Sequence, residues 1–273
     1  MRVDLAKEVA GLAWPVILQG LLTTVVFFTD RLLLGTYSDD ALGSMQIAGP
    51  VLWSMTSVLI AFSAGTMAII GRSVGAGDGA RAKETLMTSL ALALIFGCVM
   101  TTLGLSGMGS IAQLMGSGPE TSQSLRDLAV VYMEVVFWVA PLTFIASSSM
   151  VALQATGDTR TPMWISAFAG MLNLGVSYVL IFGAFGLPEL GVFGAAIGTA
   201  TSFSTQAILV LLVLLRSKGV VGLLPFKAPS LEPLRPIFRI SLPSFGERVI
   251  FHTAFLFFAG FVGYLGDVAM TAN

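Results

Sequence analysis

The sequence carries little charge. Of its 273 residues, 11% are charged and 55% are hydrophobic, and the mean hydropathy is +0.89. A soluble domain normally has about a quarter of its residues charged, which lets it cover its surface with polar groups. This composition therefore excludes an ordinary soluble globular protein, and it indicates that the lipid bilayer is the chain's main partner.

Other scarcities exclude further classes. Cys98 is the single cysteine and His252 the single histidine, so no intramolecular disulfide and no zinc-ligand spacing are available. The net charge is -1, and no basic run indicates nucleic-acid binding. The chain has no phosphate-binding loop, no nucleophile elbow and no metalloprotease helix. We therefore expect neither an enzyme nor a cofactor.

Long apolar windows are abundant. Seven of them are long enough to cross about 30 Å of hydrocarbon as helices. The first has no small-residue cleavage site at its end, which argues against a signal peptide. The sequence predicts an all-α membrane protein with about seven transmembrane helices, which we place at 12–36, 46–70, 86–107, 128–153, 163–184, 190–215 and 237–264.

The basic residues predict an orientation. With the N-terminus in the cytoplasm, eleven of the fourteen Lys and Arg residues fall in loops on the inner side. The remaining three are Arg31, Arg126 and Arg248. Cytoplasmic loops of membrane proteins carry an excess of Lys and Arg, so this distribution predicts a cytoplasmic N-terminus.

The first apolar segment starts again 228 residues later. Five identities at constant offset relate the two copies, including Pro15 with Pro243 and Gly35 with Gly263. Duplicated halves are typical of secondary transporters. The repeat predicts a six-helix lobe at 1–216, a proline-rich cytoplasmic linker at 217–236, and the first helix of an incomplete second lobe at 237–273.

Asp30 is the most informative polar residue inside the predicted spans. It lies between Val25-Val26-Phe27-Phe28 and Leu32-Leu33-Leu34. A carboxylate at such a depth is costly unless it faces protein or water, and residues of this kind usually mark ion or proton pathways. The alternative is an interfacial ion pair with Arg31 or a carboxylate that reaches outward. Thr23 falls on the same helix face as Asp30 and is a candidate for a small polar cluster.

Further candidates lie in later spans. Asn173 and Ser177 are four residues apart and share one face of their helix, where they serve either interhelical packing or ligand contact. Thr199 follows the small-residue series Gly191, Gly194 and Gly198 and is placed to line a cavity. In the second copy Glu247 stands at the position that matches Gln19, and its alternative role is a charge near the interface or an interhelical pair.

The order of several motifs resembles the bacterial branch of the multidrug and toxic compound extrusion (MATE) family. The first helix carries Leu12-Ala13-Trp14-Pro15 and then Thr29-Asp30-x4-Gly35. Two loop motifs follow, and the glycine series after Phe182 completes the pattern. These loops are Gly71-x3-Gly75-Ala76-Gly77-Asp78 and Leu153-Gln154-Ala155-Thr156-Gly157-Asp158-Thr159-Arg160-Thr161-Pro162.

The resemblance implies a fold, an activity and a location. Members of this family have twelve helices in two lobes and export organic cations and drugs in exchange for protons or sodium. In this chain Asp30 and Glu247 match acidic coupling positions, with sodium a possible ion at Asp30, and Asn173 and Ser177 match a polar pair. Many relatives carry an acid where Ser177 stands. The implied location is the bacterial cytoplasmic (inner) membrane.

Three alternatives remain at the level of sequence. A seven-helix receptor or photoreceptor is disfavoured by the cytoplasmic N-terminus and by the absence of a lysine in the last span. Another transporter of the same superfamily, such as a lipid-linked sugar flippase, shares the predicted architecture. The third is an inactive truncated fragment, or a chain that needs a missing C-terminal lobe as its partner.

Overall fold

A computed structural model describes residues 2–115, 122–217, 219–226 and 228–264. These residues form α-helices and one short 3₁₀ turn, and none of them lies in a β-strand. The all-α class predicted from the sequence is confirmed. The end of the predicted second-lobe segment, 265–273, lies outside the described part.

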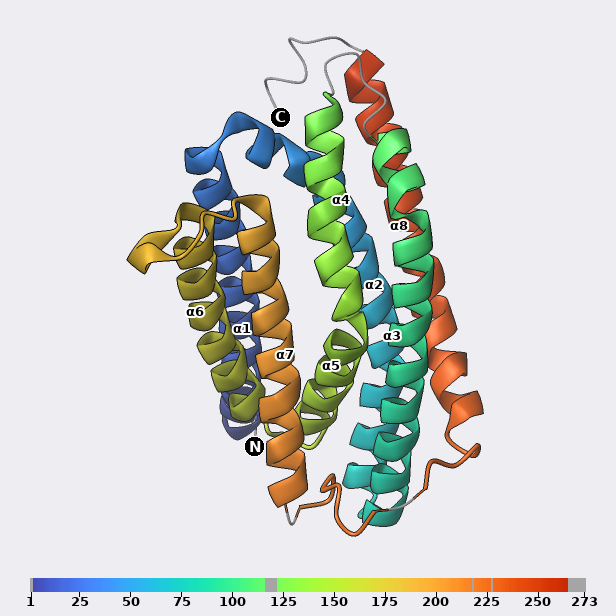
Figure 1. The fold of residues 1–273 in the computed structure, drawn as a ribbon. Helices are drawn as coiled ribbons and strands as arrows, with labels where there is room; N and C mark the ends of the chain where they lie inside the picture. The colour runs from blue at the N-terminus through green and yellow to red at the C-terminus, as the bar shows by residue number, and fades with distance from the viewer. Residues whose placement is uncertain (1, 116–121, 218, 227, 265–273) are drawn as a thin grey trace.

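Eight α-helices follow one another along the described chain (Figure 1). The first three are the longest, with 36 or 37 residues each. Their bounds are α1 Arg2–Tyr37, α2 Asp39–Gly75, α3 Gly79–Met115, α4 Gln123–Trp138, α5 Ala140–Ala155, α6 Arg160–Phe182, α7 Val192–Arg216 and α8 Leu234–Tyr264, with the 3₁₀ turn η1 at Ala184–Gly186.

Five of these helices are long and apolar enough to cross a membrane, and the pair α4 and α5 makes a sixth span if it is counted as one. The sequence predicted seven. Helix α8 lies in the seventh predicted window, 237–264, but the later part of that window includes residues whose side chains are outside the described part, so the seventh span stays a prediction.

The span predicted at 128–153 is broken. Helices α4 and α5 meet at a bend of 53°. Pro141 stands at the start of α5 and has no N–H to donate to the carbonyl of Phe137, four residues earlier. The Thr101 hydroxyl of α3 donates to that carbonyl at 2.7 Å instead. Pro141 therefore breaks the helix, and the Thr101 side chain provides a hydrogen-bond donor for the Phe137 carbonyl, which the break deprives of its usual helical partner.

Two loop motifs act as helix caps. The Asp78 carboxylate accepts a hydrogen bond from the Arg81 backbone N–H at 2.9 Å and starts α3. The Asp158 carboxylate accepts one from the Thr161 backbone N–H at 3.0 Å at the start of α6. Aspartate is favoured at helix N-termini because its oxygens satisfy backbone donors that the helix leaves free. Both aspartates therefore have a structural role.

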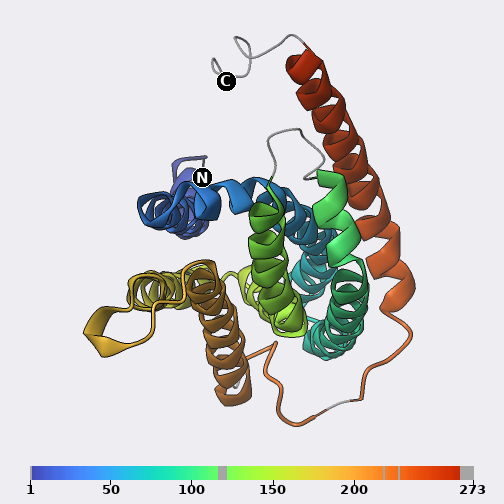
Figure 2. The same ribbon diagram turned by 45° about the horizontal axis from the view of Figure 1, so that its top comes forward.

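The helices form two groups that lie side by side along the length of the molecule (Figures 1 and 2). One group contains α1, α6 and α7, and α6 packs against both of the others. The second group contains α2, α3, α4, α5 and α8. Contacts of α7 with α4 and α5, and of α1 with α2, join the two groups. The candidate polar residues on α1, α6 and α7 therefore belong to one group.

Close packing of α6 against α7 depends on glycine. A Cβ built on Gly194 would lie 2.6 Å from the backbone carbonyl carbon of Leu180, and one built on Gly198 would overlap the Ser177 hydroxyl. Gly194 and Gly198 therefore give α7 a close-packed face toward α6. Small residues let two backbones approach in a bilayer, where no hydrophobic effect drives helices together.

Helix α8 is anchored to the second group by its first two turns. Ile237 is fully buried, and its carbonyl oxygen lies 2.5 Å from where a Cβ on Gly65 would be. The Ser241 hydroxyl donates to the Phe62 carbonyl at 3.0 Å. The start of α8 is therefore held by α2, while Val249 and Ile250, about two to three turns later, are exposed.

Gly194→Ala tests the helix contact. The added methyl group meets backbone atoms of α6 that have no room to move, and overpacking of this kind costs about 1–3 kcal/mol. We expect a lower Tm for the purified protein in detergent. Gly175→Ala is the matched control, because a Cβ at this exposed α6 position meets nothing within 4 Å. Equal Tm values for the two variants would contradict this account of α6–α7 packing.

Candidate functional site

Asp30 is positioned by α1 at its contact with α6. The side chain is half-buried, and its carboxylate interacts with the side chains of Ser177 and Asn173. Both of these α6 residues are buried, and they share one helix face as their spacing of four predicts. The structure therefore brings together three of the residues that the sequence singled out.

Oxygen atoms in this group are left without partners. Asp30 Oδ1, Asn173 Oδ1 and Ser177 Oγ are all buried and make no hydrogen bond of good geometry. Buried polar atoms in proteins are paired in the great majority of cases, because an unpaired one costs about 1–3 kcal/mol. A cation or a proton bound between the two helices would give these three oxygens a partner.

Thr199 extends the group to α7 and α4. Asn173 Nδ2 lies 3.5 Å from Thr199 Oγ1, and the Tyr132 hydroxyl lies 3.0 Å from the same oxygen. Thr199 and Tyr132 are both buried. A polar track therefore runs from Asp30 through Asn173 and Thr199 to Tyr132, and four helices contribute to it. We call these residues with Ser177 the Asp30 cluster.

Sequence reasoning missed Tyr132. The residue is buried on α4, and it belongs to the main hydrophobic core. A signal was present, since a tyrosine within a membrane span needs a hydrogen-bond partner for its hydroxyl. Nearby Glu134 is exposed on the same helix.

Asp30 and Arg31 do not pair. No ion pair joins them in the part of the chain that the structure describes, because their side chains leave α1 in different directions. The Arg31 guanidinium lies over the Phe27 ring at 4.4 Å from its centroid and reaches Gly49 of α2. The alternative of an Asp30–Arg31 ion pair is therefore wrong.

Two predicted site residues lie elsewhere. Thr23 is exposed, and its hydroxyl donates to the Gln19 carbonyl of its own helix at 3.0 Å, so the structure does not bring it to Asp30. Glu247 is exposed on α8, on the opposite side of the bundle from α1 and α6 (Figures 1 and 2). In the described structure Glu247 is not part of the Asp30 cluster.

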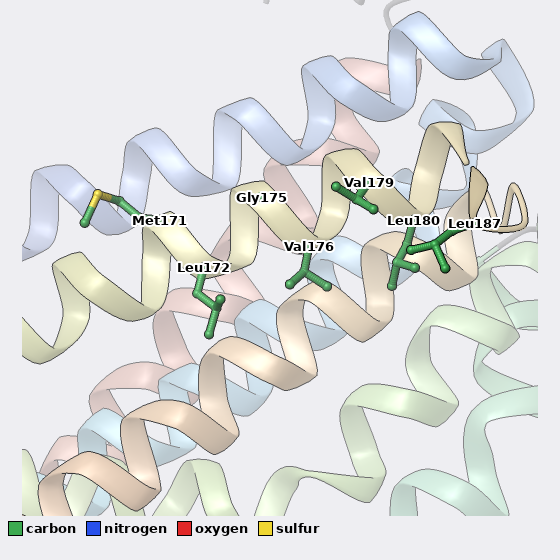
Figure 3. Close-up of a pocket in the computed structure, with 7 residues that line it drawn as sticks. All are labelled: Met171, Leu172, Gly175, Val176, Val179, Leu180 and Leu187. Atoms are coloured by element: carbon green, nitrogen blue, oxygen red, sulfur yellow. The ribbon is translucent and has the colours of Figure 1, made fainter. Parts of the chain in front are cut away.

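A separate groove lies on the outer face of α6. It has a volume of about 390 Å³, and its lining is almost entirely apolar. Figure 3 shows the side chains of Leu172, Val176 and Leu180 along this face, with Leu187 from the following loop. Asn173 and Ser177 are buried and do not line the groove, so it is separate from the Asp30 cluster. Its chemistry suits lipid chains.

Acidic residues do not gather elsewhere. Among the described residues, no group of three or more His, Cys, Asp or Glu side chains is placed to hold a metal ion. An ion held at the Asp30 cluster would therefore meet one carboxylate together with neutral amide and hydroxyl oxygens. Oxygen ligands of this kind are those that hard cations take.

Known proteins share this fold and much of this sequence. The chain is 30% identical over 273 residues to "Probable multidrug resistance protein NorM" of Thermotoga maritima, which covers 99% of this chain and 57% of the relative. It is 28% identical over 205 residues to "Probable multidrug resistance protein YoeA" of Bacillus subtilis, covering 75% and 43%. The chain thus spans about half the length of these curated relatives.

Solved structures agree on the architecture. An outward-facing multidrug resistance MATE family transporter of the MOP superfamily superposes with a TM-score of 0.83 at 24% identity, over 92% of this chain and 54% of that one. The family model described as MatE matches residues 15–179, which include Asp30, Asn173 and Ser177. By fold and by sequence, the chain belongs to the MATE family of membrane transporters.

Proposed function

We propose that this chain forms the N-terminal lobe of a cation-coupled antiporter that exports organic cations and drugs. One observation carries the proposal: a half-buried carboxylate on α1 faces buried, unpartnered amide and hydroxyl oxygens on α6. Family membership supports the transport class, and the names of two relatives include multidrug resistance. The proposed location is the bacterial cytoplasmic membrane.

The coupling follows from the cost of an uncompensated charge. An ionised Asp30 between α1 and α6 stabilises arrangements in which water or a cation reaches it. A proton or a sodium ion at the carboxylate removes that requirement and allows the helices to close around it. An ion that binds one state better than another shifts the equilibrium between the states by the difference in affinity. Release of the organic cation is then linked to uptake of the small cation.

Both coupling ions fit the same residues. A proton needs only the Asp30 carboxylate, with the Ser177 and Asn173 side chains as hydrogen-bond partners. A sodium ion needs several oxygens, and Asn173 Oδ1 and Ser177 Oγ are available because neither has another partner. Ser177 adds no second negative charge, so Asp30 alone carries the coupling charge in this cluster.

A second lobe is part of the proposed machine. The chain spans 57% of the Thermotoga relative, and Glu247, Val249 and Ile250 of α8 are exposed. We infer that transport belongs to a two-lobe assembly in which these surfaces are covered. The segments proposed for this chain are the lobe 1–216, the linker 217–236 and the beginning of the second lobe from 237 onward.

Asp30→Asn tests the coupling residue. The amide keeps the size of the side chain but can neither take up a proton nor hold the charge for a cation. We would use inverted vesicles from cells that express the gene's full natural reading frame. In these vesicles we expect ion-driven uptake of a fluorescent organic cation to fall at least tenfold. Imposed proton and sodium gradients, applied one at a time, identify the coupling ion.

Glu134→Gln is the matched control, because it removes an exposed acid from α4 with the same change of charge. It should transport like the wild type and appear in the membrane in equal amount. Transport by Asp30→Asn at the wild-type rate would refute the coupling role of Asp30.

Orientation gives an independent test. With the N-terminus in the cytoplasm, the loop between α2 and α3 is cytoplasmic and the loop between α1 and α2 is external. In a background where Cys98 is replaced by alanine, Asp40→Cys should react with an impermeant maleimide in intact cells. Gly77→Cys should react only after the membrane is opened. The reverse labelling pattern would overturn the proposed orientation.

A further inference from the structure

A cavity of about 450 Å³ lies between the early part of α1 and the loop that joins α5 to α6. Its lining comes from Gly11 and Leu12 of α1 and from residues 157–160 at the start of α6. Both segments lie at the end of the bundle that holds the N-terminus (Figure 1). No residue of the Asp30 cluster lines this cavity, so the proposed coupling does not use it.

The cavity lies at the depth where the hydrocarbon of a bilayer meets the headgroups. Helix α6 has 23 residues, or roughly 35 Å of helix, which is close to the hydrocarbon thickness of about 30 Å. Its first residue, Arg160, therefore lies at the boundary. Trp164, one turn later, is 67% exposed, and tryptophan is enriched at membrane interfaces. Leu12 is exposed as well, so a ligand here would meet both apolar and polar surroundings.

A buried hydroxyl lines the cavity without a partner. Thr159 is only 6% exposed, and its hydroxyl makes no hydrogen bond with the residues that the structure describes. The hydroxyl of Thr156, in the same loop, donates to the Leu153 carbonyl at 2.7 Å. Buried polar groups are paired in the great majority of cases. The Thr159 hydroxyl is therefore available to a ligand in the cavity.

Two opposite charges share the lining. Asp158 Oδ1 accepts a hydrogen bond from the Thr161 backbone N–H at 3.0 Å, and a carboxylate can accept further bonds at its second oxygen. Arg160 is exposed, and within the described structure it forms no ion pair. The N-terminus of α6 adds a partial positive charge beside it. The cavity thus offers an acceptor for a cation and, two residues away, a donor for an anion.

We propose that this cavity binds the headgroup of an aminophospholipid, a membrane lipid that carries a phosphate and a primary ammonium group. The phosphate meets the Arg160 guanidinium and the Thr159 hydroxyl, and a guanidinium matches phosphate oxygens with paired N–H donors. The ammonium group donates to the free oxygen of Asp158. The acyl chains lie beside Leu12 and Trp164. A lipid fits better than a soluble phosphate ester because the site lies at the edge of the bilayer, where basic pockets bind headgroups.

Lipid selectivity tests the site. Native mass spectrometry counts the lipids that stay bound to the purified product of the full natural reading frame. The probes are dioleoyl phosphatidylethanolamine, phosphatidylcholine and phosphatidylglycerol at equal concentration. Choline keeps the positive charge but has no N–H to donate, and glycerol has no positive charge. We expect the ethanolamine lipid to bind about fivefold more tightly than either of the others, which is the worth of one hydrogen bond.

Asp158→Asn isolates the carboxylate. Asparagine caps a helix about as well as aspartate, so α6 keeps its start while the negative charge is lost. The preference for the ethanolamine lipid should disappear. Asp78→Asn is the matched control, because Asp78 caps α3 in the same way at 2.9 Å but does not line the cavity. It should bind all three lipids like the wild type.

Two further variants test the phosphate end. Arg160→Gln removes the guanidinium, and Thr159→Val replaces the unpartnered hydroxyl by a methyl group of similar size. Because all three lipids carry the phosphate, Arg160→Gln should weaken the binding of each about tenfold. Thr159→Val should weaken each to a smaller extent. Thr159→Val also keeps the test decisive if Asp158→Asn does not fold.

Several results would overturn the proposal. Equal binding of the three lipids, or an ethanolamine preference that survives Asp158→Asn, would refute the headgroup site. Tightest binding of phosphatidylglycerol would assign the cavity to anionic lipids instead. Soluble phosphoethanolamine that binds as tightly as the lipid would assign it to a water-soluble phosphate ester. The measurement is of binding alone, so its outcome is independent of whether the protein exports organic cations.

Discussion

The cost of an unpaired polar group in hydrocarbon governs this bundle. A bilayer offers no water to donors and acceptors, so each must find a partner within the protein. Most hydroxyls do so in the simplest way. Those of Thr24 and Thr29 donate to backbone carbonyls four residues earlier in α1, at 3.0 and 2.9 Å. Such residues add little polarity to a helix, and their positions say little about function.

Longer side chains find partners across helices. Gln19 of α1 donates to the Ser166 hydroxyl at 2.8 Å and accepts a bond from Gln154 at 3.0 Å, which joins α1, α5 and α6. Thr66 and Ser89 join α2 to α3 in the same way, at 2.9 Å. These links are satisfied and therefore hold the helices together. The Asp30 cluster differs because three of its buried oxygens, Asp30 Oδ1, Asn173 Oδ1 and Ser177 Oγ, make no hydrogen bond.

Against that background, the two adjacent charges of α1 stand out. Neighbouring residues on a helix point about 100° apart, so Asp30 faces α6 while Arg31 faces α2. The separation prevents them from neutralising each other. Each charge then needs a partner that the described helices do not supply in full.

Much of the fold was predictable from the sequence, because apolar length and turn residues act locally. Each of the seven predicted windows falls on a helix or on the bent α4–α5 pair. The pairing of Asn173 with Ser177 was predictable for the same reason, since a spacing of four defines one helix face. The bend at Pro141 was not predicted, although proline gives a local reason for it. The bend also leaves the Phe137 carbonyl without a helical partner, and the hydroxyl that donates to it belongs to Thr101, 36 positions earlier in the chain.

The sequence by itself determined which residues enter the bilayer and which carry charge there, because hydropathy and charge are properties of single residues and short segments. Tertiary structure alone decided which charge meets which partner. It brought Tyr132 and Thr199 to the Asp30 cluster, placed Thr23 and exposed Glu247 away from it, and turned Arg31 toward Gly49. These outcomes depend on how helices distant in sequence approach one another, and that approach is set by small residues such as Gly198 where two helix backbones meet.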